Sequence, residues 1–128
     1  MAITIVRLGS TRRRGEGLRL GTVRRPPRGV PKSQVATQNW YDVWLPALAP
    51  STELMRRTTM DECGQWWPAF AKRFEAELKK PEASRLLDVL AALSHQINFS
   101  VGCYCENERH CHRSLLRGAL RDRGAFVQ

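Results

Sequence analysis

A strand-like segment between two helical patterns limits this chain to folds that combine helices with a sheet. Residues 97–105 alternate apolar and polar side chains, which predicts a β-strand with Ile97, Phe99, Val101, Cys103 and Cys105 on its core face. Leucines spaced three and four residues apart at 82–93 and 111–123 predict helices on either side. We therefore expect an α/β domain with a short, mostly parallel sheet flanked by helices.

Two more strands are expected near the N-terminus. The β-branched run at 3–8 ends at Gly9, and residues 18–20 form a second apolar run after a charged, exposed loop at 12–17. Three prolines at 24–32 exclude both a helix and a central strand, because proline lacks a backbone donor. This segment should be a fixed loop that carries Arg24, Arg25 and Arg28.

The middle of the chain predicts one extended segment and two helices. The aromatic run at 40–45 favours a short strand or an extended segment buried against the rest. Ser51 is expected to cap a brief helix. Thr59 and Glu62 have capping-box spacing, which predicts a longer helix from there to about Lys80. Its core-facing stripe would be Trp67, Phe70, Phe74 and Leu78.

Size and composition indicate one folded domain over residues 1–128. The chain has 42% hydrophobic and 26% charged residues, which is ordinary for a globular protein. Its N-terminus lacks the residue order of a secretory signal, and no apolar stretch approaches the roughly 18 residues that span a bilayer. We expect a cytoplasmic protein with no membrane partner, and the sequence leaves its oligomeric state unknown.

Positive charge is concentrated at the N-terminal end. The net charge is +9, and residues 1–32 contain nine Lys and Arg but one acidic residue. Such a patch is typical of binding to phosphate, from a nucleotide to a nucleic acid, although it also suits an arginine-rich solvated surface. If nucleic acid binds, its affinity should fall steeply with salt, and charge reversal at residues 12–14 should reduce that slope.

Three of the four cysteines, Cys103, Cys105 and Cys111, lie within nine residues. They follow the expected strand and precede the expected helix, the position where ligands bind in open α/β sheets. Cys111 would begin the helix, where the helix dipole and neighbouring arginines favour the thiolate. We expect Cys111 to be accessible and the most reactive thiol, with Cys103 and Cys63 shielded.

The two residues after Cys111 each allow two interpretations. His112 should face the sheet, where it could orient or deprotonate a neighbouring group, or anchor the helix to a strand carbonyl. Arg113 could hold a phosphate or carboxylate in a bidentate contact, or lie on the surface and pair with Glu106 or Glu108. In the second case it would belong to a solvated row with Arg117 and Arg121.

A metal site is disfavoured by the cysteine spacing. Cys103, Cys105, Cys111 and His112 are ligand types that suit zinc, but they do not follow the usual knuckle pattern. We therefore expect no cofactor and no stoichiometric metal. Two Cys-x5-Arg spacings also occur, but neither stretch has the glycines that a phosphate-wrapping loop requires.

Several short motifs resemble those of the YeaO-like proteins, known as domain of unknown function 488. They are Pro27-Arg28-Gly29, Ala49-Pro50-Ser51, and Cys111-His112-Arg113, and the likeness extends over about residues 3–121. The resemblance implies a compact bacterial cytosolic α/β domain with no established activity. Val23 and Pro26 stand where similar proteins usually carry an acid and an aromatic residue, so an activity that needs that acid would be missing here.

The leading hypothesis is a domain that binds a phosphate-bearing ligand, nucleotide or nucleic acid, in a crevice between the Arg24 to Arg28 loop and the helix start at Cys111. The ligand-binding residues would be Arg24, Arg28, Cys105 and Arg113. One alternative is a cysteine-dependent enzyme with Cys111 as nucleophile and His112 as base. Another is a structural or metal-binding domain. A Cys111→Ser variant should separate the first two, because only the enzyme needs the thiol.

Overall fold

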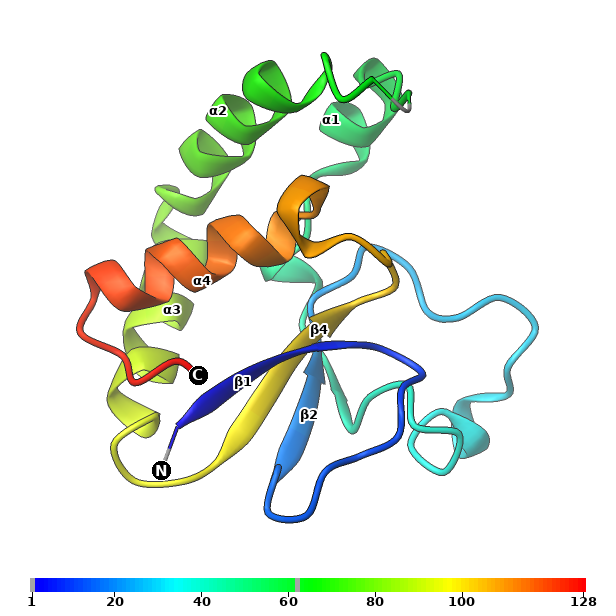
Figure 1. Cartoon of the computed structure of the whole chain (residues 1–128), viewed down its shortest axis with the longest axis vertical. Helices are drawn as coiled ribbons and strands as arrows, with labels where there is room; N and C mark the ends of the chain where they lie inside the picture. Colours follow the sequence, from blue (N-terminus) through cyan, green and yellow to red (C-terminus); the bar gives the residue numbers. More distant parts are fainter. Residues whose placement is uncertain (1, 62) are drawn as a thin grey trace.

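A four-stranded parallel sheet forms the centre of the protein in a computed structural model that describes residues 2–61 and 63–128 (Figure 1). The strands are β1 (Ile3–Arg7), β2 (Leu18–Gly21), β3 (Val43–Trp44) and β4 (Phe99–Cys103). The described α-helices are α1 (Thr52–Arg57), α2 (Trp67–Leu78), α3 (Pro81–Leu93) and α4 (His112–Asp122). Short 3-10 turns occur at Lys32–Gln34, Pro46–Leu48 and Glu108–His110.

The strand order is β1-β4-β2-β3, and every neighbouring pair is parallel. The two neighbours of β4 are in register with it, since Val101 pairs with Ile5 on one side and with Leu20 on the other. This arrangement confirms the α/β fold expected from the sequence. None of the described helices combines the length and apolar character needed to cross a bilayer.

One face of the sheet builds the main core together with the helices. Phe99 and Val101 of β4 belong to the same buried cluster as Phe74 of α2, Leu87 of α3 and Leu116 of α4. α4 packs on β4 and also contacts α2 and α3. Burial of each large apolar side chain contributes roughly 1.5–3 kcal/mol, so this cluster holds α4 firmly against the sheet.

Loops cover part of the opposite face and bury an ion pair there. Arg19 Nε lies 2.8 Å from Glu16 Oε2, and Ser100 of β4 donates a 2.6 Å hydrogen bond to the same oxygen. Burial alone would raise the pKa of Glu16, but the hydrogen bonds from Arg19 and Ser100 lower it to about 2. The expected exposure of the whole 12–17 loop is therefore wrong at Glu16, which is buried.

Two strand predictions need correction. β4 covers only residues 99–103 of the expected 97–105, and all five of its residues are buried. A central strand of a parallel sheet is covered on both faces, so Ser100 and Gly102 are buried despite the alternating pattern, whereas Ile97 is exposed. β3 lies at the sheet edge and its two residues are exposed, so the burial expected at 40–45 is wrong for Val43 and Trp44, whereas Tyr41 is buried.

The helix predictions are largely confirmed. Ser51 caps α1, since its hydroxyl oxygen accepts a hydrogen bond from the Leu54 amide. The longer helix does not begin at Thr59, because α2 begins at Trp67 with a proline in its first turn. The other half of the expected capping box, Glu62, lies outside the described residues. The buried stripe of α2 is Phe70, Phe74 and Leu78, whereas Trp67, the first residue of the expected stripe, is only partly buried.

Candidate functional site

The candidate site lies where β4 ends and α4 begins. Cys103 is the last residue of β4, Cys111 is the N-cap of α4, and His112 is the first residue of that helix. A loop with the 3-10 turn Glu108–His110 joins the two elements, and Asn107 caps this turn with its side chain. The carboxyl end of a central strand and the start of a helix thus place the three side chains on rigid supports.

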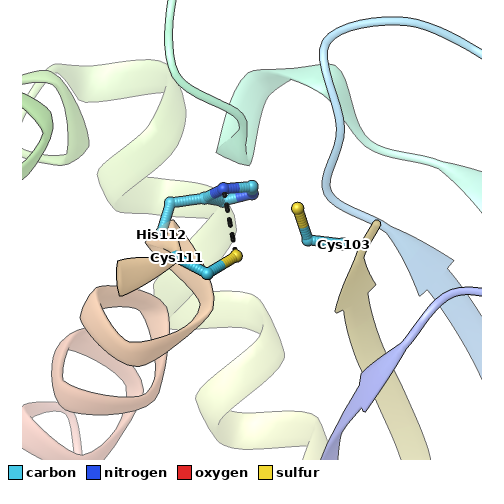
Figure 2. Close-up of side chains that lie close together, drawn as sticks. All are labelled: Cys103, Cys111 and His112. Atoms are coloured by element: carbon cyan, nitrogen blue, oxygen red, sulfur yellow. Dashed lines mark hydrogen bonds between the residues drawn. The ribbon is translucent and has the colours of Figure 1, made fainter. Parts of the chain in front are cut away.

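Cys103, Cys111 and His112 converge on one point (Figure 2). One ligand atom from each, two sulfurs and an imidazole nitrogen, lies within 4.8 Å of the others, and all three residues are buried. The Sγ atom of Cys111 is 3.8 Å from Nδ1 of His112. A third sulfur, from Cys105, lies 3.7 Å from that of Cys103. The structure therefore gathers three thiols and one imidazole that are spread over ten residues of sequence.

His112 has a fixed orientation. Its Nε2 lies 2.5 Å from the backbone carbonyl oxygen of Thr22, just after β2, and its ring meets Phe74 edge-on at 5.5 Å. Because a carbonyl only accepts hydrogen bonds, Nε2 carries a proton and donates it. In the neutral ring, Nδ1 then carries no proton. It is free to accept a hydrogen bond from the Cys111 thiol, or to bind a metal ion together with the Cys111 sulfur. The sheet-facing position expected for His112 is confirmed, and it includes the anchoring contact to a backbone carbonyl.

The thiols are electrostatically coupled. Hydrogen bonds from Cys103 and Cys105 lower the pKa of Cys111, and the neighbouring His112 acts in the same direction. The pKa of Cys103 is raised by its contacts with Cys105 and Cys111 and by burial. These contacts therefore favour the thiolate at Cys111 over the thiolate at Cys103.

The exposure of the cysteines differs from expectation. Cys111 is only 2% exposed, so the accessibility expected for a loop thiol is wrong. Cys103 is buried, as expected, whereas Cys63 is exposed instead of shielded. Cys105 is also exposed, because β4 ends two residues earlier and leaves it in the loop.

Arg113 is inside the protein. It is 4% exposed, and its Nη2 donates a 2.6 Å hydrogen bond to the carbonyl oxygen of Cys105. Its Nε is buried without a hydrogen-bond partner among the described residues. Of the two interpretations of Arg113, the surface position is therefore wrong, and Arg113 is also not among the residues that line the cavity described below. The acids proposed as its partners pair elsewhere, Glu108 with Arg117 and Glu106 with Arg7.

A cavity of about 1240 Å³ opens over the cluster. It lies between the Arg24 to Arg28 loop and the start of α4, and Cys103, Cys105, Cys111 and His112 all line it. Aromatic and methionine side chains also line the walls. They are Trp40, Met55, Met60, Trp66, Phe70 and Tyr104.

Five arginines line this cavity, and they differ in whether their side chains form hydrogen bonds or ion pairs within the protein. Arg24 donates hydrogen bonds to the backbone carbonyl oxygens of Pro46, Ala49 and Pro50, so its guanidinium holds the adjacent loop. Arg7 pairs with Glu106. Among the described residues, the side chains of Arg25, Arg28 and Arg56 have no hydrogen bond or ion pair.

Several cavity residues were missed by the sequence analysis. Arg56 comes from α1, and Trp66 precedes α2, so neither is near the cysteines in sequence. His110 lies against Trp66 and Trp67, with ring centroids 6.1 and 5.6 Å away. The Trp66-Trp67 pair was a visible signal, because two adjacent tryptophans before a helix exceed what one core-facing stripe can bury.

Comparison with known proteins identifies the family. No curated protein and no solved structure matches the chain. Residues 3–124 match the family DUF488-N3a, described as the active DUF488-N3 subclade. This match covers nearly the whole sequence and confirms the resemblance to YeaO-like proteins. The match shows that the protein belongs to the DUF488 family.

Proposed function

We propose that the protein binds a small, phosphate-bearing ligand with a ring, of the size of a mononucleotide, in the cavity above the cysteine cluster. One observation carries this proposal. Arginines without carboxylate partners among the described residues line the same cavity as three thiols and an imidazole. The description of the matching subclade as active supports a working site in this chain.

The anion would be held by Arg25, Arg28 and Arg56. Guanidinium groups bind phosphate through paired N–H donors, and a group with no internal ion pair does not have to break one on binding. Arg25 and Arg28 come from the proline-rich loop and Arg56 from α1, so the anion would be approached from two elements.

The walls and the volume favour a ligand with a ring. Trp40 and Tyr104 meet edge-on at 5.8 Å, and both line the cavity together with Trp66. Aromatic walls with a few charged groups are typical of small-molecule sites, which usually have volumes of roughly 300–1,000 Å³. A cavity of about 1240 Å³ has room for a nucleotide.

The N-terminal charge is less available than the sequence suggests. Arg12 forms an ion pair with Asp42 at 2.7 Å, and Arg19 is buried against Glu16. Internal pairing neutralises part of the charge that an extended nucleic acid would contact. This favours a small ligand over a nucleic acid.

Titration calorimetry with AMP, adenosine and inorganic phosphate tests the proposal. AMP should bind, and adenosine should bind at least tenfold more weakly because it lacks the charged group. Arg28→Ala and Arg56→Ala should each weaken AMP binding by about tenfold or more, since a hydrogen bond to a charged group contributes roughly 1.5–3 kcal/mol. Arg73→Ala on the exposed face of α2 is the matched control, and its affinity should equal that of the wild type.

Equal affinity for AMP and adenosine would contradict the proposal. An equal loss of AMP affinity in the cavity variants and in the Arg73 control would also contradict it. Binding of a single-stranded oligonucleotide that Arg12→Glu weakens, but Arg28→Ala does not, would instead favour a nucleic-acid surface.

A further inference from the structure

We propose that Cys103, Cys111 and His112 bind a zinc ion and leave one coordination position facing the cavity. This goes beyond the proposed ligand binding and does not depend on it, because it rests on the cluster and not on the arginines. It also reverses the expectation drawn from the cysteine spacing.

The donor set suits zinc. Two thiolates and one imidazole are the soft and borderline ligands that zinc prefers. With Zn–S near 2.3 Å and Zn–N near 2.0–2.1 Å, donor atoms around a tetrahedral ion lie roughly 3.5–3.8 Å apart. The Cys111 sulfur and His112 Nδ1 are already 3.8 Å apart, and the three donors lie within 4.8 Å of one another. Closure around an ion needs shifts of about 1 Å or less.

The imidazole is oriented as a metal ligand requires. Metal-bound histidines usually donate their second ring N–H to a carbonyl or carboxylate, which fixes the tautomer and the ring plane. Here Nε2 donates to the Thr22 carbonyl oxygen, so Nδ1 is left to face the Cys111 sulfur (Figure 2).

The secondary-structure elements that carry the three ligands explain the unusual spacing of the cysteines in the sequence. Knuckle patterns arise where tight turns present the cysteines. Here Cys103 comes from the end of a fully buried strand, and Cys111 and His112 come from the start of a helix that packs on that strand. The packing of α4 against β4 therefore brings the donor atoms together, and the spacing of the cysteines along the sequence does not have to follow a knuckle pattern.

The arrangement leaves a fourth position. All three ligands line the cavity, so an ion held by them would have one side open to it. The Cys105 sulfur is 3.7 Å from that of Cys103, but Cys105 is exposed in the loop after β4 and does not belong to the group whose donor atoms all lie within 4.8 Å of one another. We assign it to the cavity wall and not to the ligand set. Such an ion would place a Lewis acid on the floor of the cavity.

Metal content of the full chain tests the assignment. The protein is expressed with added zinc and purified with a reducing agent and no chelator. Elemental analysis should find about one zinc ion per chain. Cys111→Ser should lose it, whereas Cys63→Ser and Cys105→Ser should retain it. Cys63 is the matched control, since it is an exposed cysteine outside the cavity lining.

A second measurement covers the case in which Cys111→Ser does not fold. Cobalt(II) titrated into the chelator-treated wild type should give a thiolate charge-transfer band and the intense visible bands of a tetrahedral site, and zinc should displace them. Substoichiometric zinc together with no charge-transfer band would overturn the proposal. Loss of zinc in Cys63→Ser equal to that in Cys111→Ser would also overturn it. Loss of zinc in Cys105→Ser would show a closed four-ligand site and overturn the open position.

Discussion

The Nε2 atom of His112 lies 2.5 Å from the carbonyl oxygen of Thr22, and this hydrogen bond ties the start of α4 to the segment after β2. It crosses 90 residues of sequence and is buried from solvent. The same contact therefore bears on stability as well as on the orientation of the ring.

Replacement of His112 by alanine should lower the free energy of unfolding by about 1–3 kcal/mol, because the Thr22 carbonyl would lose its partner inside the protein. His95→Ala is a close control, since His95 Nε2 makes a 2.9 Å contact with the Gly124 carbonyl at an exposed position. Water can replace that contact, so the control should change stability by about 0.5 kcal/mol or less. Urea unfolding measures both, and equal losses would show that burial of the His112 contact is irrelevant.

The Glu16–Arg19 pair should be essential for folding stability. Glu16→Gln would leave the guanidinium of Arg19 buried without its counter-charge, at a cost of about 3–5 kcal/mol. Glu75→Gln on the exposed face of α2 removes the same charge and should change stability by about 0.5 kcal/mol or less. Chemical denaturation compares the two, and a Glu16 variant as stable as the control would refute the prediction.

The same pair predicts a pH dependence. The pKa of Glu16 is lowered from 4.5 to about 2, so its ionised form stabilises the native state fully above pH 4.5. This contribution is lost as the pH falls from about 4.5 towards 2, because the unfolded chain takes up a proton at Glu16 in this range while the native carboxylate stays ionised. Melting temperatures over this range should fall more steeply for the wild type than for Glu16→Gln. Parallel curves would assign acid sensitivity to other groups.

Thiol alkylation should follow burial. In the native protein, Cys63 and Cys105 are exposed and should react with iodoacetamide before Cys103 and Cys111, which are buried. Mass spectrometry at timed intervals ranks the four sites, and the unfolded protein serves as the reference. Rapid modification of Cys111 in the folded chain would instead restore the sequence-based expectation that it is the most reactive thiol.

Two glycines should respond to alanine in opposite ways. Gly118 lies within α4 with open space around the position of a Cβ atom, so Gly118→Ala should stabilise the protein by about 0.5–1 kcal/mol. Gly17 has a φ of +79°, and its Cβ would lie 1.9 Å from the Asn98 carbonyl oxygen. Gly17→Ala should therefore destabilise the protein strongly. Thermal melts of the two variants check the signs, and a shift in the same direction would contradict this prediction.

The sequence predicted those features that depend on neighbouring residues in the chain. The stripe of Phe70, Phe74 and Leu78 was visible because burial on one helix face imposes a period of 3.6 residues. The cap at Ser51 was visible because hydrogen bonding at a helix start needs a short polar side chain. Both signals are local, and the structure confirms both.

Contacts between distant segments left no such signal. Arg113 follows the four-residue spacing of Arg117 and Arg121, which predicts an exposed side chain. The loop after β4 covers the first turn of α4 and buries Arg113. A helical period does not show such a contact. Cys103 was correctly expected to be buried. Its position next to Cys111 depends on the packing of α4 against β4, so the sequence did not show it.

Arg24 couples two parts of the cavity wall mechanically. One guanidinium binds three carbonyl oxygens between Pro46 and Pro50, directly before α1, so the proline-rich loop and α1 are pinned to each other at this point. Separating them would break all three hydrogen bonds at once. Both segments line the cavity, so this one side chain holds two of its sides at a fixed spacing.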